Sequence, residues 1–303
     1  MSDGQSPVLL IKGSARTIDS TLVMGVVNAS PESFSDGGRH SSFDAQVALA
    51  ASLIEAGADI IDVGGQSAVT NQPPVEEDLE VERVLPIVEW LVREFPDVLV
   101  SVDTYKPRVV DAVLQAGAHI INDVSGLRFP EVASSCAEHG AALVVMHTAA
   151  PPKVRLQDPA LYADVTADVV GFLQERMQVA IEAGVPRESL ILDPGPDFTK
   201  TPYQTVEILR RIDEFRAFGR PLLLALSRKD FLGAITHRTP RQRDAATAAA
   251  IAHLAVTPGN IVRVHDVAAA VDVIATIDVL VGRRDLEPDY VLPDSLRYEK
   301  PRE

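Results

Sequence analysis

Short apolar runs recur along the chain, and each is followed by a stretch with the three- and four-residue spacing of apolar side chains that is typical of a helix. The runs are continuous rather than alternating, which indicates strands covered on both faces and therefore a parallel sheet. These runs occupy residues 21–27, 59–63, 98–102, 119–121, 142–146, 190–192, 221–226 and 260–264.

Eight strand-then-helix units in 303 residues predict an α/β protein built as one closed (β/α)8 (TIM) barrel. A doubly wound open sheet is the alternative architecture. We expect an N-terminal extension (residues 1–20), a barrel (21–283) and a polar, Pro-containing tail (284–303). Helices are expected at residues 44–55, 76–94, 107–115, around Cys136, at 162–183 and at 203–215. Ala-rich helices are expected from about 229 to 256, and a last helix is expected after the final strand, up to about 281.

Polar side chains stand where the predicted strands end. Because all strands of a barrel point their carboxyl ends at one rim, we expect these side chains to converge on a single mouth. A lone aspartate after a strand is as well explained by a turn cap, but a whole set is not. The set comprises Asn28, Asp103, Asn122, His147, Asp193, Lys229, Arg263 and His265.

The residue types in this set suggest a ligand. Lys229, Arg263 and His265 are predicted to be cations from the last two strands, where barrels of this kind often hold phosphate. Asn28 offers an oxygen to Mg²⁺ that is held mainly through a substrate phosphate. A further trio of acceptors and donors suits the edge of a planar heterocycle, although it does not define a reaction: Asp103, Asn122 and Asp193.

Composition excludes several classes of partner. With 28 basic and 43 acidic residues the formal net charge is −15, which argues against nucleic acid and anionic membranes. No apolar run is long enough to span a bilayer, and residues 1–13 lack the pattern of a secretory signal. The only cysteine, Cys136, suits a reducing compartment, so we expect a cytoplasmic protein.

Several motifs resemble those of the dihydropteroate synthase family. Residues 26–38 (Val-Val-Asn-Ala-Ser-Pro-Glu-Ser-Phe-Ser-Asp-Gly-Gly) look like its first signature, and residues 59–65 (Asp-Ile-Ile-Asp-Val-Gly-Gly) like the opening of its second. The resemblance extends over about residues 21–282. The other matching motifs, in the family's order, are residues 101–104 (Ser-Val-Asp-Thr), 121–126 (Ile-Asn-Asp-Val-Ser-Gly), 146–147 (Met-His), 192–195 (Leu-Asp-Pro-Gly), 227–229 (Ser-Arg-Lys) and 263–266 (Arg-Val-His-Asp).

The resemblance implies a TIM barrel, usually a homodimer, that joins 6-hydroxymethyl-7,8-dihydropterin diphosphate to p-aminobenzoate. It implies that Asp103, Lys229 and Arg263 are the catalytic residues. The implied ligand contacts are Asp103, Asn122, Asp193 and Lys229 for the pterin, Arg263, His265 and Asn28 for the diphosphate, with Asn28 acting through Mg²⁺, and Phe198 and Ser227 for p-aminobenzoate.

Two departures from the family pattern concern the second substrate. Where the family reads Gly-Gly-Glu-Ser-Thr-Arg-Pro-Gly, this chain reads Gly-Gly-Gln-Ser-Ala-Val-Thr-Asn at residues 64–71, so the Arg position holds Val69. Asp197 replaces a glycine and places a carboxylate close to where the carboxylate of p-aminobenzoate is expected, which is unfavourable.

These departures resemble the diverged second branch of synthase-like proteins found in some actinobacteria. Two functions therefore stay open: a synthase with an unusual second loop, and a homologue that binds a pterin-type ligand without making dihydropteroate or that uses a different acceptor. A third, the methyl-pterin-binding barrel of corrinoid methyltransferases, is disfavoured because no corrinoid-binding segment follows and because the cations indicate a diphosphate.

Overall fold

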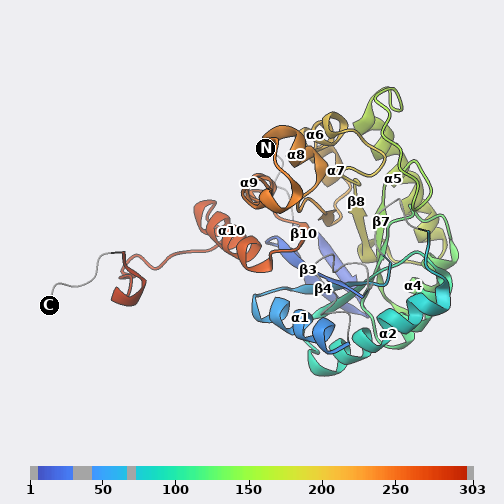
Figure 1. Ribbon diagram of the computed structural model, residues 1–303, viewed down its shortest axis with the longest axis horizontal. Coiled ribbons are helices and arrows are strands. Elements are labelled where there is room, and N and C mark those ends of the chain that lie inside the picture. Colours follow the sequence, from blue (N-terminus) through green and yellow to red (C-terminus); the bar gives the residue numbers. More distant parts are fainter. Residues whose placement is uncertain (1–5, 30–42, 67–72, 299–303) are drawn as a thin grey trace.

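Eight parallel strands close into a barrel in the computed structural model, which describes residues 6–29, 43–66 and 73–298 (Figure 1). The strands follow one another around the barrel in chain order, and the last pairs with the first. The predicted α/β barrel is therefore confirmed. Its strands are β3 (Leu22–Asn28), β4 (Ile60–Gly64), β5 (Leu99–Asp103), β6 (Ile120–Asp123), β7 (Ala142–Met146), β8 (Leu190–Asp193), β9 (Leu222–Leu224) and β10 (Asn260–Val264).

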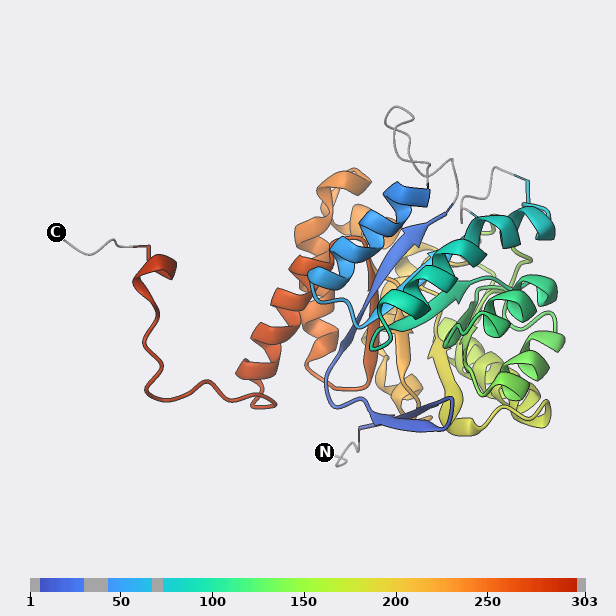
Figure 2. The ribbon, with the colours of Figure 1, turned by 90° about the horizontal axis from the view of Figure 1, so that it is seen from below.

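Helices surround the barrel and cover the outer face of the strands (Figures 1 and 2). Short 3-10 turns at Arg187–Ser189, Pro240–Gln242 and Asp294–Leu296 complete the described secondary structure. The helices are α1 (Phe43–Glu55), α2 (Glu77–Glu94), α3 (Pro107–Gln115), α4 (Glu131–His139), α5 (Val165–Glu182), α6 (Pro202–Arg210), α7 (Asp213–Arg216), α8 (Asp230–Thr236), α9 (Asp244–Ala255) and α10 (Val267–Leu280).

Two predicted helices have different bounds. The helix expected at 162–183 begins only at Val165, because the Asp164 carboxylate caps it by accepting from two backbone N–H groups of the first turn. The helix expected at 203–215 was wrong as a single element, since α6 ends at Arg210 and α7 follows as a separate turn.

The barrel interior is apolar at its amino end. Alternate strand residues such as Met24, Ile60 and Ile191 point inward and form one buried cluster. A hairpin of β1 (Val8–Ile11) and β2 (Ser14–Thr17) joins this cluster and closes the amino end of the barrel, as Figure 2 shows. A ligand can therefore enter the barrel at the opposite end, where the strands have their carboxyl ends.

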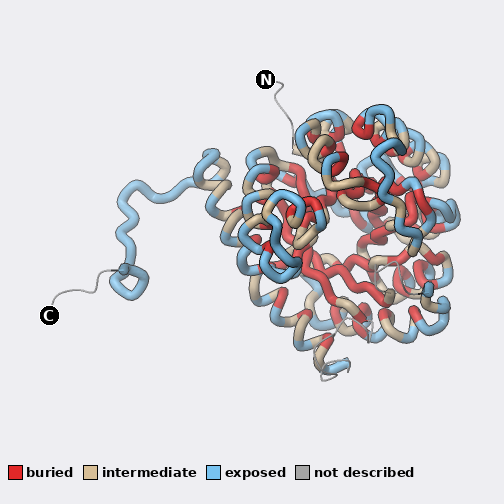
Figure 3. The backbone as a smooth tube through the Cα atoms, turned by 45° about the horizontal axis from the view of Figure 1, so that its top comes forward, coloured by how far each residue is buried: buried red, intermediate tan, exposed pale blue. Residues whose placement is uncertain are grey.

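The chain after α10 runs away from the barrel. Residues 284–298 are exposed along their whole length, and Figure 3 shows the contrast with the buried strands. Among the described residues, no helix combines the length and the apolar character needed to cross a membrane.

Candidate active site at the carboxyl end of the barrel

A cavity of about 740 Å³ opens at the carboxyl ends of the strands. Its walls include every residue for which sequence motifs implied a ligand contact, so the expected convergence on one mouth is confirmed for these positions. They are Asn28, Asp103, Asn122, Asp193, Phe198, Ser227, Lys229, Arg263 and His265.

His147 does not belong to this cavity, so the expectation that it faces the mouth was wrong. Side chains alternate along a strand: Met146, at the end of β7, lines the mouth, and the next side chain points the other way. His147 lines a separate cavity of about 260 Å³, and its Nδ1 lies 2.8 Å from the Lys200 Nζ.

An aspartate without an assigned role, Asp62, organises the base of the mouth. It comes from the interior of β4 and is fully buried, and its two carboxylate oxygens bind donors from three other strands. Ser101 Oγ donates to Oδ1 at 2.6 Å, while Asn122 Nδ2 at 3.3 Å and Arg263 Nε at 2.7 Å donate to Oδ2. The sequence signal was an acid between two apolar residues of a buried strand.

Arg263 is held between two carboxylates. Besides its bond to Asp62, its Nη2 lies 3.2 Å from Asp103 Oδ2. Burial of the guanidinium opposes its charge, but the two carboxylates outweigh that cost and raise the pKa of Arg263 above its ordinary value. These bonds use only part of the guanidinium, so further donors remain for a ligand.

Two acids of the mouth are shifted toward their neutral forms. Burial raises the pKa of Asp103 to about 7 even though Arg263 favours its charged form. Burial likewise raises the pKa of Asp193 to about 6, against the opposing effects of the Gly195 N–H bond and of Lys229. Both groups can therefore accept from, or share a proton with, a ligand near neutral pH.

Asn122 and Lys229 supply the complementary groups. Asn122 Oδ1 is buried and accepts no hydrogen bond from the described part of the chain, so a ligand donor would satisfy it. Lys229 Nζ donates to Pro196 O at 3.0 Å and lies 4.2 Å from the centre of the Phe198 ring. Burial lowers the pKa of Lys229, while the nearby Asp197 and Asp193 favour its charged form.

This geometry agrees with comparisons to known proteins. The model of the pterin-binding enzyme family matches residues 24–265, which is most of the chain. The chain belongs to this family. The dihydropteroate synthase of Bacillus subtilis is 38% identical to it over 282 residues, which cover 92% of this chain and 95% of the relative.

Solved structures of the family share the fold over nearly the same range. The dihydropteroate synthase of Yersinia pestis, in complex with a sulfonamide drug, has a TM-score of 0.84 and 34% identity, and covers 91% of this chain and 100% of its own. The enzyme of Xanthomonas albilineans with 4-aminobenzoic acid has a TM-score of 0.83 and 39% identity, covering 91% of this chain and 98% of its own. The chain is thus similar to dihydropteroate synthases over nearly its whole length.

The loop after β8 carries the pterin-binding family's Asp-Pro-Gly motif and is braced by a buried lysine that sequence analysis left without a role. Lys200 is 0% exposed, and its Nζ binds Gly195 O and Phe198 O, both at 2.9 Å, as well as His147 Nδ1. Gly195 adopts a φ of +67°, and a Cβ there would lie 2.2 Å from the His147 carbonyl oxygen, so only glycine fits.

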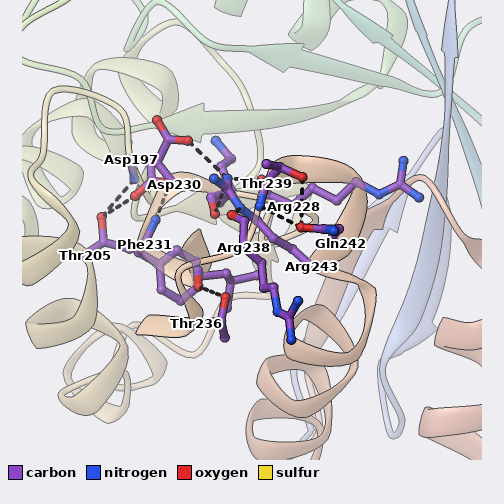
Figure 4. Close-up of polar contacts among 12 residues, drawn as sticks. Asp197, Thr205, Arg228, Asp230, Phe231, Thr236, Arg238, Thr239, Gln242 and Arg243 are labelled. Carbon is purple, nitrogen blue, oxygen red and sulfur yellow. Dashed lines mark hydrogen bonds and ion pairs between the residues drawn. The ribbon is translucent and has the colours of Figure 1, made fainter. Parts of the chain in front are cut away.

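Asp197, which replaces a family glycine, keeps the left-handed backbone with a φ of 63°. Figure 4 shows that its carboxylate turns toward α6 and α8. Oδ1 accepts from Thr205 Oγ1 at 3.0 Å and Oδ2 accepts from the Phe231 N–H at 3.2 Å. Asp197 lines the mouth, but both of its oxygens are engaged with these partners.

Arg243 fixes the segment that carries Lys229. Its Nη1 donates to the carbonyl oxygens of Arg228 at 2.8 Å and Lys229 at 3.1 Å, and its Nε donates to Arg238 O (Figure 4). A Cβ on Gly233 would lie 2.2 Å from Arg243 Nη2, so the glycine makes room for this clamp.

His265 lies at the mouth as expected, and its surroundings in the unliganded chain favour the neutral imidazole over the expected cation. Burial and the neighbouring Arg228 and Arg263 lower the pKa of His265 to about 4, so the imidazole is neutral near pH 7. Its Nδ1 lies 2.9 Å from Ser227 Oγ. In this state it can offer a hydrogen bond rather than a charge.

Asn28 and Asp103 lie on the two strands that flank β4, and the β4 residue between them is Gly64, which has no side chain. Gly64 pairs with both residues, and its position leaves an opening between Asn28 Oδ1 and Asp103 Oδ2, 3.9 and 4.0 Å from where a Cβ would stand. Among the described residues, no group of three or more His, Cys, Asp or Glu side chains could hold a metal ion. An ion beside Asn28 would therefore need oxygens from the substrate.

Gln66, at the start of the second loop, is tied to the chain that leads into α2 and to the start of α3. Gln66 Oε1 accepts from the Val75 N–H at 2.7 Å and from Lys106 Nζ at 3.3 Å, and Lys106 is also paired with the buried Glu80. The replacements at residues 67–71, including Val69, lie outside the described residues.

Proposed function

We propose that this protein is a dihydropteroate synthase that condenses 6-hydroxymethyl-7,8-dihydropterin diphosphate with p-aminobenzoate. The observation that carries the proposal is the single cavity in which Asp103, Asn122, Asp193 and Lys229 lie together with Arg263. The unsatisfied Asn122 Oδ1 and the two carboxylates suit the N–H groups of a pterin ring, and Lys229 suits its carbonyl oxygen. The relatives named as dihydropteroate synthases support the same reading.

In the proposed reaction the bond between the pterin methylene carbon and the diphosphate oxygen breaks, and the oxygen keeps the electron pair. The amine of p-aminobenzoate forms the new C–N bond and loses a proton. Asp103 and Asp193 lie where they stabilise the positive charge that develops on the pterin, while Arg263 and the neutral His265 donate to the departing diphosphate. Phe198 and Ser227 form the wall against which the amine substrate packs.

Mg²⁺ is the cofactor that fits this site. Asn28 Oδ1 faces the opening beside Gly64, and the ion's other ligands would be substrate oxygens and water. When bound, the ion supplies positive charge to the leaving diphosphate.

Turnover tests the proposal directly. The purified protein is incubated with Mg²⁺ and the dihydropterin diphosphate, and diphosphate release is followed with and without p-aminobenzoate. We expect release to accelerate with p-aminobenzoate and to yield dihydropteroate. Lys229→Ala and Arg263→Ala should abolish binding of the diphosphate substrate, whereas Arg284→Ala, on the exposed chain after the barrel, should not.

A second candidate function is a homologue that binds the pterin diphosphate without making dihydropteroate or that uses another acceptor. The replaced residues of the second loop and the Asp197 carboxylate on the cavity wall favour it. Tight binding of the dihydropterin diphosphate without any acceleration by p-aminobenzoate would select this function over the first.

We further propose a homodimer. Around the end of α10 and the adjacent end of α9, Val256, Leu280 and Val281 are 51%, 75% and 40% exposed, which is a surface suited to a second copy. Light scattering measures the mass, and Leu280→Asp should shift it toward that of one chain.

A further inference from the structure

Part of the segment between β7 and α5, residues 147–164, forms one wall of the mouth. Residues 151–157 all line the cavity. Both ends of this stretch are tied to the chain that follows Phe198. The bonds are Ala149 N to Thr199 Oγ1 (3.0 Å), Tyr162 Oη to Thr199 O (3.1 Å), and Gln204 Nε2 to Asp158 O (3.2 Å) and Pro159 O (3.3 Å).

This anchoring puts the segment on the acceptor side of the cavity. Phe198, which lines the proposed amine pocket, directly precedes the anchoring residue Thr199. The pterin side, in contrast, is formed by strand ends on which Asp103 and Arg263 are already paired with each other. The segment at 147–164 is therefore placed to contact the second substrate rather than the first.

Arg155, on this wall, has its charge available. Other arginines of the cavity are paired with carboxylates: Arg263 with Asp62 and Asp103, and Arg228 with Asp244 at 2.8 Å. Within the described chain Arg155 forms no ion pair, and its Nη2 donates to the neutral Gln157 Oε1 at 3.2 Å. An exposed arginine of this kind can take a carboxylate in a two-bond geometry.

The Asp197 carboxylate lies on the same side of the cavity but is held by other partners, so it leaves Arg155 available to a ligand. Asp197 is held by Thr205 Oγ1 and by the Phe231 N–H, so its orientation is fixed toward α6 and α8 (Figure 4). The sequence also offers Val69 where the second loop of the family has arginine. A cation from a different loop is then needed if the acceptor is an anion.

We propose that Arg155 binds the anionic group of the acceptor, so that residues 147–164 set the preference for an aromatic amine that carries a carboxylate. This inference rests on the proposed transfer of a pterin to an amine. Arg155 is a specificity-determining residue: it acts on the end of the acceptor remote from the reacting amine and leaves the chemical step unchanged.

The test compares two acceptors of the same shape, p-aminobenzoate and its neutral amide, 4-aminobenzamide. The wild type should prefer p-aminobenzoate. Arg155→Ala should raise the KM for p-aminobenzoate about tenfold, the size expected for loss of a hydrogen-bonded charged contact, with unchanged kcat, unchanged KM for the pterin diphosphate and unchanged KM for the amide. Arg155→Lys should restore part of the preference, and Arg284→Ala is the matched control.

Two results would overturn the inference: equal use of both acceptors by the wild type, or a preference for p-aminobenzoate that survives Arg155→Ala. Failure of the underlying reaction looks different, because then neither acceptor accelerates diphosphate release. In that case equilibrium binding of p-aminobenzoate to protein loaded with a pterin and inorganic diphosphate, compared between wild type and Arg155→Ala, decides the role of Arg155. Equal affinities would refute it.

Discussion

Replacing Asp62 by Asn tests how the base of the mouth is held together. The change keeps the size of the side chain but removes the charge that faces Arg263 at 2.7 Å. For charges about 4 Å apart at an effective dielectric constant of about 20, the attraction is about 4 kcal/mol. Removing one partner of a buried pair costs about 3–5 kcal/mol, and Asp103 still neutralises part of the guanidinium charge. We therefore expect unfolding free energy to fall by about 3 kcal/mol, measured by urea denaturation.

Ser101→Ala is the matched control. It removes the 2.6 Å bond to Asp62 Oδ1 and leaves every charge in place, so it should cost only about 1 kcal/mol. In Asp62→Asn, Arg263 is also less well oriented, and affinity for the dihydropterin diphosphate should fall at the same time. If Asp62→Asn loses no more stability than Ser101→Ala, the charge of Asp62 does not hold Arg263 and the reasoning is refuted.

Lys200→Met leaves the three acceptors that bind the ammonium group without a donor, so it should lower the unfolding free energy by roughly 2–4 kcal/mol. Urea denaturation measures this, and an unchanged midpoint would show that Lys200 does not stabilise the loop after β8. Gly233→Ala drives a methyl into Arg243 and should cost about 2 kcal/mol and weaken pterin diphosphate binding, while Gly171→Ala, with no atom within 4 Å, should cost nothing. Because the pKa of Asp103 is about 7 in the folded protein and about 4 when unfolded, its contribution to stability is lost as pH rises from about 4 through 7. Asp103→Asn lacks this loss, so its unfolding free energy relative to that of the wild type should rise between pH 5 and pH 8. A difference in unfolding free energy that does not change with pH would count against the raised pKa.

The barrel could be predicted because its signal is redundant. Eight continuous apolar runs, each buried on both faces, leave few architectures open. The break between α6 and α7 could not be predicted, because Ile208, Ile212 and Phe215 keep helical spacing across it and all three are buried. The sequence also gave no sign that residues 8–17 fold back to plug the amino end, since β2 is exposed along its length.

The limits of site prediction follow from strand geometry. Position at a strand end places a Cα at the rim but does not say which way the side chain points, which is why His147 was misplaced beside the inward Met146. Asp62 was overlooked for the opposite reason, as it points inward but lies two residues before the strand ends. The charge state of His265 depends on burial, on Arg228 from the loop after β9 and on Arg263 two residues earlier, and only the last of these can be read from the local sequence.

The charges of the mouth differ between its base, which faces the pterin in the proposed reaction, and its rim, which faces the leaving diphosphate. At its base, Asp62, Asp103 and Asp193 face Arg263 and Lys229, so the cluster has one more negative than positive charge when all five groups are ionised and is balanced when Asp103 is protonated. Such a base favours the positive charge that stays on the pterin and gives little net attraction to the diphosphate that leaves. In the proposed reaction, compensation for the leaving group would come from the rim, where Asn28 is the proposed ligand of Mg²⁺ and the neutral His265 can donate. A site organised in this way should bind a pterin without its diphosphate in the absence of Mg²⁺, but should need the ion to bind the diphosphate ester tightly; calorimetry with and without Mg²⁺ measures both affinities, and ion-independent binding of the ester would contradict this division.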